Sequence, residues 1–230
     1  MNKENAFIKL PKTLEEKCEG KRIIVVLWKA SLETVKTRKG DFELLNCDHS
    51  SLITKKSGKN ISDLRPDIVH QELMSLLDSP LNKAGKLQIY VSTTKGVLIE
   101  VSSELRIPRT FKRFSGLMVQ LLHKLKIKGT STNVTLLKVI KNPISRHLPA
   151  GARIYGFSVV GTKYNPRLLA AKLPEDVPVV FYFGAMASGH ITIEEHPEIE
   201  EMISVSEFSL SGALAINRVL GAVENEWGVV

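Results

Sequence analysis

The sequence predicts an α/β fold built on a largely parallel sheet. Two observations support this prediction. The runs RIIVVLW at 22–28 and PVVFYFG at 178–184 are continuously apolar, which is typical of strands buried on both faces. Segments with helical periodicity lie between such runs, and alternating strands and helices favour a parallel sheet. No segment has the composition of a linker, so we expect one domain over 21–230 after a flexible polar arm at 1–20.

In the first half of the chain, the first apolar run is followed by FELLNCDHS, which predicts a short strand leading into a loop. A helix is expected over 63–80, because Pro66 suits the first helical position and a Ser-Pro pair ends the pattern. The segment at 86–101 predicts two strands joined by a tight Lys-Gly turn.

In the second half, a helix is predicted at about 108–126, followed by a loop. VTLLKVI at 134–140 predicts another buried strand, and 152–161 predicts a strand or an edge segment. The last apolar run leads into the glycine-bearing loop GAMASGH at 184–190. The segment at 204–227 begins as a loop and becomes a helix, whose apolar face we expect to contribute to contact between subunits.

Basic charge is concentrated in the middle of a chain whose net charge is +8. Between positions 95 and 128 there are eight Lys/Arg and two Glu. The helix predicted there carries Arg109, Lys112 and Arg113 in its first turns, where the helix dipole disfavours cations and like charges repel one another. Such a conflict indicates a bound anion, and arginine forks match phosphate oxygens. The residues alone leave both a nucleic-acid surface and an ordinary solvated helix face open.

Several functional classes lack their motifs. The sequence contains no GxxxxGK[ST] phosphate loop and no GxGxxG after a strand, and its histidines and cysteines have no metal-ligand spacing, so we expect no metal. The apolar stretches are too short to span a bilayer, and two cysteines with no signal-peptide core indicate a reduced, intracellular protein. A membrane-surface protein remains an alternative that rests on charge alone.

Four segments carry a specific resemblance, namely 65–101, 107–125, 136–144 and 184–189. They closely resemble the eukaryotic small-subunit rRNA (pseudouridine-N(1)) methyltransferases, a SPOUT-class ribosome-biogenesis family required for mitotic growth. The resemblance covers about 22–230 and is most specific in the middle third of the chain.

The resemblance implies a SPOUT fold, in which a C-terminal trefoil knot binds S-adenosylmethionine. It implies methylation of ring nitrogen N1 of a pseudouridine in a hairpin loop of 18S rRNA, by a homodimer whose RNA sites each draw on both subunits. It further implies a structural role in small-subunit assembly, with assembly factors and the pre-ribosome as partners, and a location in the nucleus and nucleolus.

The family's RNA contacts and its acidic positions match residues of this chain. The resemblance implies RNA contacts at Arg65, Arg106, Arg109 and Arg113. Asp67 matches an acidic position with a structural role, and we expect it to stabilise the helix N-terminus and to pair with Arg65. Asp78 is the candidate acceptor for the ring proton, and its alternative role is to close the helix toward Ser79.

The family's cofactor contacts match two loops and one strand position. They fall on Phe157, Gly184, Gly189, His190, Ile191, Val205, Ser206, Glu207, Phe208, Ser209 and Leu210. The chain departs from the family at two positions: arginine is common where Ser188 stands, and proline is usual where Ser209 stands. A non-catalytic rRNA-binding assembly factor therefore remains an alternative to the enzyme.

Overall fold

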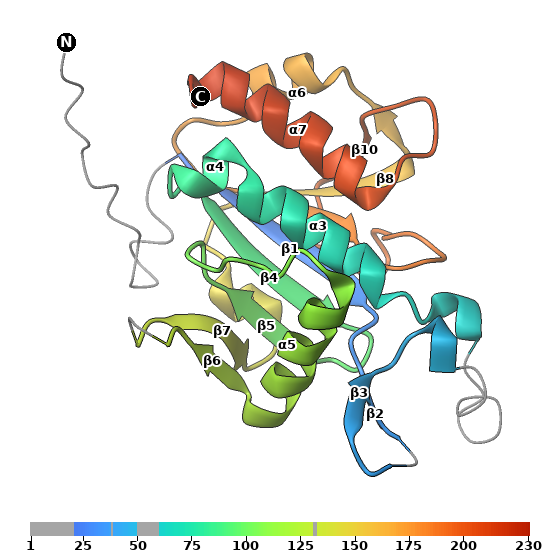
Figure 1. The fold of residues 1–230 in the computed structure, drawn as a ribbon. Helices are drawn as coiled ribbons and strands as arrows, with labels where there is room; N and C mark the ends of the chain where they lie inside the picture. The colour runs from blue at the N-terminus through green and yellow to red at the C-terminus, as the bar shows by residue number, and fades with distance from the viewer. Residues whose placement is uncertain (1–20, 38, 50–59, 131–132) are drawn as a thin grey trace.

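The computed structural model describes residues 21–37, 39–49, 60–130 and 133–230, and the predicted arm at 1–20 lies outside the described residues (Figure 1). The central sheet has eight strands in the order β10-β8-β9-β1-β4-β5-β7-β6, and β2 and β3 form a separate hairpin. Neighbouring strands from β10 to β4 are parallel, whereas the pairs from β4 to β6 are antiparallel. The predicted α/β class with a largely parallel sheet is confirmed.

The strands, in chain order, are β1 (Ile23–Ala30), β2 (Thr34–Lys36), β3 (Phe42–Leu44), β4 (Leu87–Thr93), β5 (Leu98–Val101), β6 (Lys126–Lys128), β7 (Thr135–Ile140), β8 (Arg153–Lys163), β9 (Val179–Gly184) and β10 (Glu201–Ser204). The α-helices are α3 (Pro66–Asp78), α4 (Pro80–Lys83), α5 (Phe111–Lys124), α6 (Pro166–Lys172) and α7 (Gly212–Trp227). Short 3-10 helices are η1 (Cys47–His49), η2 (Ile61–Asp63) and η3 (Ile144–His147).

Strand β1 lies between β9 and β4 and contributes to both cores of the domain. Ile23, Val25 and Leu27 belong to the larger core, while Ile24 and Val26 belong to the core on the other face of the sheet. None of these five side chains is more than 2% exposed. This alternation follows from the two-residue period of a strand. The prediction that this run is buried on both faces is therefore confirmed.

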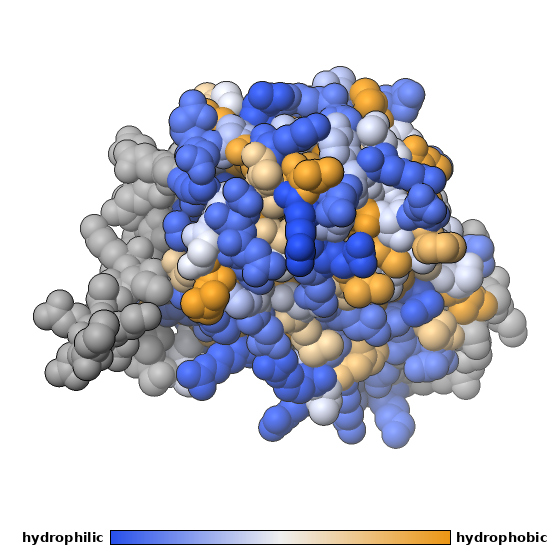
Figure 2. Space-filling model, turned by 90° about the horizontal axis from the view of Figure 1, so that it is seen from above, coloured by the Kyte–Doolittle hydropathy of each residue, from blue (hydrophilic) through white to orange (hydrophobic). Residues whose placement is uncertain are grey.

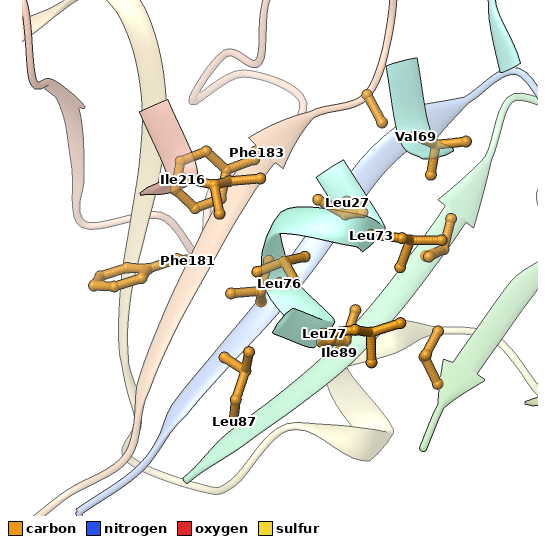
Figure 3. Packing of buried hydrophobic residues seen from close by; sticks show 14 of the residues in the cluster. Leu27, Val69, Leu73, Leu76, Leu77, Leu87, Ile89, Phe181, Phe183 and Ile216 are labelled. Atoms are coloured by element: carbon orange, nitrogen blue, oxygen red, sulfur yellow. The ribbon is translucent and has the colours of Figure 1, made fainter. Parts of the chain in front are cut away.

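The α-helices form a layer on one face of the sheet (Figure 1). Leu73 and Leu76 of α3 pack over Leu27 and Ile89 of the central strands (Figure 3). The opposite face has no such layer within the described residues, and it is covered by η3 and by the connection that carries Ile191. The larger core therefore lies between the sheet and the α-helices, and the smaller core lies on the other face.

Several local signals have their predicted consequences. Pro66 occupies the first turn of α3, and Ser79 ends that helix and caps α4, where its Oγ accepts from the amide of Asn82 at 3.2 Å. Gly96 adopts φ 72° in the turn between β4 and β5, a conformation that glycine adopts without strain.

Other expectations are wrong in detail. Helix α5 begins at Phe111 rather than at about 108, because Thr110 has the extended backbone of a cap. Strand β7 was predicted to be buried, but only Leu137 is buried, because β7 lies in the antiparallel half of the sheet and only β6 separates it from the edge. The segment at 152–161 is not an edge, since β8 lies between β10 and β9.

The apolar face of α7 is used inside the protomer, contrary to the expectation of a subunit contact. Val219, Leu220 and Val223 are at most 1% exposed and belong to the larger core. Trp227 packs against the same core, and the ammonium of Lys21 lies 5.2 Å from its ring centroid. A subunit contact would therefore have to use other residues of this helix.

Across the described ranges, no helix is long and apolar enough to cross a bilayer. The predicted trefoil knot remains a prediction.

Candidate functional site

A cavity of about 420 Å³ lies where β8, β9 and β10 meet the first turns of α3 and α7. Phe183 and Gly184 line it from the end of β9, and Ser204 lines it from the end of β10. Ile68 of α3 and Gly212 of α7 form the opposite wall. In open α/β sheets, ligands bind outside the carboxyl ends of the strands, so this is the position where a small ligand is expected.

The cavity brings together almost all of the residues matched to cofactor contacts. Its lining includes Phe157, Gly184, Gly189, His190, Ile191, Val205, Ser206, Phe208, Ser209 and Leu210. Glu207 belongs to the same loop but does not line the cavity. The residues come from three separated stretches of sequence, and the fold alone explains their proximity.

The inner wall of the cavity is aromatic. Phe157 stacks on Phe183 with 4.4 Å between ring centroids and 9° between ring planes, and its edge meets Phe181 at 5.1 Å. Phe208, in contrast, is 76% exposed and lies at the rim. An aromatic inner wall with a further aromatic side chain at the rim suits a flat, partly apolar group such as a nucleobase.

The loop at 184–190 has little free space at its first residue. A Cβ at Gly184 would lie 2.9 Å from Cε of Met186, which also lines the cavity. Gly189 has φ 80°, a conformation that favours glycine. Ser188 donates from Oγ to Oδ1 of Asp63 at 2.7 Å, which ties the loop to η2.

Serine side chains shape the loop at 204–211. Ser204 donates from Oγ to the carbonyl oxygen of Ser206 at 2.7 Å, and the amide of Phe208 donates to Oγ of Ser206 at 3.0 Å. Ser211 caps α7, because its Oγ accepts from the amide of Leu214 at 3.3 Å. These local bonds fix the conformation of a loop that has serine rather than proline at position 209.

Arg65 is the one predicted RNA contact that lines the cavity. Its guanidinium donates to both carboxylate oxygens of Asp67, at 2.8 and 2.6 Å. This bond holds the pKa of Asp67 below its usual range, although partial burial opposes the shift. Asp67 stands in the first turn of α3, so its predicted pairing with Arg65 and its predicted position at the helix start are both present.

The other three predicted RNA contacts lie away from the cavity. Arg109 donates from Nη2 to Oδ1 of Asp78 at 3.0 Å, and its Nη1 contacts the other oxygen. Arg106 and Arg113 are exposed, and neither forms an ion pair within the described residues. Asp78 ends α3, and it lies about 15 Å along the axis from Ile68, which lines the cavity.

The start of α5 changes the interpretation of its arginines. Arg106 and Arg109 precede the helix, and Lys112 and Arg113 occupy its first turn. Pro108 does not begin the helix; its carbonyl oxygen accepts from Nε2 of His70 at 2.7 Å, which anchors the loop to α3. The cations therefore extend from a fixed loop into the helix.

The sequence interpretation missed part of the cavity wall. Ile68 and Gln71 line it together with Arg65, and Ala213 and Ala215 line it from α7. Ile68 lies three residues after Arg65, and Gln71 lies three residues after Ile68. Residues at this spacing are neighbours on a helix surface, so helical periodicity could have found them. Among the described residues, no group of three or more His, Cys, Asp or Glu could hold a metal ion.

Comparison with known proteins gives one consistent result. A family model described as EMG1/NEP1 methyltransferase matches residues 25–224. The ribosomal RNA small subunit methyltransferase NEP1 of Mus musculus is 50% identical over 216 residues, and that of Homo sapiens is 48% identical over 217 residues. Each match covers 93% of this chain and 85% of the relative. The crystal structure of Archaeoglobus fulgidus Nep1 bound to S-adenosylhomocysteine aligns with a TM-score of 0.72 at 27% identity, over 91% of this chain and 99% of that one.

Proposed function

The chain belongs to the EMG1/NEP1 methyltransferase family, and on that premise we propose that it methylates ring nitrogen N1 of a pseudouridine in small-subunit ribosomal RNA. It is an S-adenosylmethionine-dependent rRNA methyltransferase, in keeping with the names of its relatives and with the S-adenosylhomocysteine bound to a structural neighbour. The substrate is proposed to be a hairpin loop of 18S rRNA.

The cavity between the strand ends and α3 is the observation that supports this proposal most directly. Its volume of about 420 Å³ falls within the roughly 300–1,000 Å³ typical of small-ligand sites. Phe157 and Phe183 offer an aromatic wall for adenine, and the backbones around Gly184 and Leu210 offer hydrogen-bonding groups for its edge. The residues present therefore fit S-adenosylmethionine, which supplies a methyl group from its sulfonium when bound.

Arg65 connects the cavity to the RNA. It lines the cavity and carries a fork that matches phosphate oxygens, so RNA and methyl donor meet at this residue. The target base must leave its loop to reach the cavity, as for other enzymes that act on bases. The ring N–H proton of pseudouridine must also be removed, and Asp78 is the proposed acceptor, oriented by Arg109.

A homodimer is part of the proposal. Within one protomer, Asp78 and Arg109 lie at the far end of α3 from the cavity. A two-fold dimer in which one protomer's Asp78 and Arg109 face its partner's cavity would complete the site. Further partners are proposed to be assembly factors on the pre-ribosome, and the proposed location is the nucleus and nucleolus.

A non-catalytic assembly factor is the second candidate, because Ser188 replaces a common family arginine. In this structure, Ser188 instead binds Asp63 and fixes the loop at 184–190. The hydroxyl of Ser188 thus holds the loop by a hydrogen bond to Asp63. We take this as support for a cavity that still binds the cofactor.

The decisive experiment is mass spectrometry of a hairpin RNA incubated with the protein and S-adenosylmethionine. We expect the RNA that contains pseudouridine to gain the mass of one methyl group. The matched control is the same hairpin with uridine at that position, whose N1 is bonded to the ribose and has no proton to lose. Hairpin binding without any mass gain would favour the assembly factor, and equal gain on both RNAs would place the modification at another atom.

A further inference from the structure

Glu72 is a buried carboxylic acid for which the described residues provide no hydrogen-bond partner. It lies on the face of α3 that packs against α7, and its exposed fraction is 0%. Neither carboxyl oxygen has a hydrogen-bond partner within the described part of the chain. Burial raises the pKa of Glu72 well above its usual range, because the charged form of the carboxyl is disfavoured away from water. Buried polar groups normally have partners, so this one requires an explanation.

Gly212 provides the space that the carboxyl occupies. A Cβ at Gly212 would lie 2.0 Å from Oε1 of Glu72 and 3.0 Å from its carboxyl carbon. Real Cβ atoms essentially never lie within 3.0 Å of such an atom, so either Glu72 or the helix must shift if position 212 carries a side chain. The carboxyl of one helix therefore stands where a side chain of the other would begin.

This contact lies directly behind the wall of the cavity. Gly212 and Ser211 line the cavity from the start of α7, and Ile68 and Gln71 line it from α3, within one turn of Glu72. The position of the first turn of α7 relative to α3 therefore affects the shape of the cavity on this side. Glu72 and Gly212 hold that position between them.

The chemistry of the helix end explains why an acid is used rather than an apolar side chain. The first turn of a helix has N–H groups without intrahelical partners and a partial positive charge. Oγ of Ser211 accepts from the amide of Leu214, the third residue of α7. A carboxyl oxygen beside this helix end lies near the positive end of the helix dipole, although it accepts no hydrogen bond within the described residues.

We propose that Glu72 is a positioning residue for the methyl donor, acting through Gly212. The two residues form a matched pair that fixes the first turn of α7 and thereby the shape of the cofactor cavity. This inference rests on the proposed function, because it assumes that the cavity binds S-adenosylmethionine. It does not require Glu72 to touch the ligand or to be ionised.

The test is a set of variants read out by calorimetry with S-adenosylhomocysteine. Gly212→Ala should weaken binding about tenfold or more, since residues in contact couple strongly. Glu72→Ala removes the obstruction, so the double variant Glu72→Ala/Gly212→Ala should bind better than Gly212→Ala alone. Glu72→Gln keeps the shape of the side chain beside Gly212 and should bind like the unmodified protein. Affinity for the RNA hairpin should stay unchanged in all of them.

Gly221→Ala is the matched control. Gly221 lies on the same helix as Gly212, and a Cβ added there would meet nothing within 4 Å. It should leave cofactor affinity unchanged and raise Tm, as alanine does in a helix interior.

If Gly212→Ala does not fold, the double variant still decides, since the proposal requires that it folds and binds. Normal binding by Gly212→Ala, or no rescue in the double variant, would overturn the pair. Loss of binding in Glu72→Gln would also overturn it. An unmodified protein that ignores the ligand would instead refute the proposed function.

Discussion

Two of the four arginines assigned to RNA already hold a carboxylate. Arg65 binds Asp67 and Arg109 binds Asp78, and all four side chains are partly exposed to solvent. Ion pairs exposed to solvent contribute little net stability, so a phosphate can compete with the carboxylate for donors of the arginine. The two acids therefore keep the arginines oriented while RNA is absent, and the arginines remain available to it.

Glu72 should make stability depend on pH. Its folded-state pKa is raised above an ordinary value of 4.5, so the unfolded chain releases a proton in a range where the folded chain does not. Its contribution to stability is therefore complete below that ordinary value and falls as pH rises, by about 1.4 kcal/mol per pH unit per proton. Glu72→Gln removes this dependence. Its Tm relative to the unmodified protein should rise between pH 5 and pH 8, as thermal melts would show.

Asp67→Asn is a control for which the expected change of stability with pH has the opposite sign. The pKa of Asp67 is lowered by its bond to Arg65, so its contribution is present at neutral pH and is lost as pH falls through the folded-state value. A Glu72→Gln variant whose melting profile parallels that of the unmodified protein across the range would contradict a neutral, buried Glu72.

At the scale of the elements, long apolar runs were predictable and short elements were not. The runs of β1 and β9 are buried on both faces because helices cover one side and loops the other. Strand β10 has four residues and begins where an acidic stretch ends, and only its pairing with β8 defines it. Helix α6 was missed although Asn165 caps it and Pro166 begins it. Local sequence carries the signal of a cap but not the pairing of a distant strand.

The candidate site divides in the same way. Its glycine and serine loops could be assigned by resemblance, whereas the wall formed by α3 and α7 depends on how two helices pack. No local pattern at Glu72 or Gly212 reveals that they touch, because 140 positions of sequence separate them.

The first turn of α5 allows a test that separates binding from stability. Arg113 is exposed there without an ion pair within the described residues, and the helix dipole disfavours it. Arg113→Glu should stabilise the fold by roughly 0.3–1 kcal/mol. The same change should weaken hairpin binding and reduce the slope of log affinity against log salt by about 0.7–0.9. Denaturant melts and filter binding at several salt concentrations measure the two effects.

Arg167→Glu is the matched control, because Arg167 is also an exposed cation in the first turn of a helix. It should show the same direction of stability change with no effect on RNA affinity or its salt slope. Equal losses of RNA affinity in both variants would mean that net charge, rather than the surface around Arg113, determines binding.

At the scale of the whole molecule, the faces of the protomer differ in what they leave exposed. Seen from the side of α6 and α7, the surface is mainly hydrophilic and its apolar side chains gather in small separate groups (Figure 2). Leu168 of α6, Leu214 of α7 and Val160 of β8 are large apolar residues that remain exposed, at 62%, 47% and 70%. We expect the contact between subunits to involve such residues, since the inner face of α7 is already buried.

Mixing two inactive variants tests whether each site is shared between subunits. Gly184→Trp should fill the cavity, and Asp78→Asn should remove the proton acceptor, so each homodimer should be inactive. In a mixed dimer, the intact cavity of one subunit meets the intact Asp78 of the other. Random mixing should then restore about a quarter of normal activity, since half of the dimers are mixed and each has one complete site. Methylation assays on refolded mixtures measure this.

No recovery would mean that cavity and acceptor belong to the same subunit or that the protein does not exchange subunits. Light scattering on the mixture and a tagged-subunit pull-down distinguish these cases.

The place of Arg65 has a consequence for cooperativity. Its side chain lines the cavity proposed for the methyl donor, and it is also a proposed contact of the RNA, so we expect the two ligands to affect each other's binding. Thermodynamic linkage requires that, if one ligand changes the affinity for the other by some factor, the second ligand changes the affinity for the first by the same factor. Hairpin affinity measured with and without saturating S-adenosylhomocysteine should therefore change by the same factor as S-adenosylhomocysteine affinity measured with and without hairpin. In Arg65→Ala, that factor should fall toward one, because the residue proposed to contact both ligands is lost.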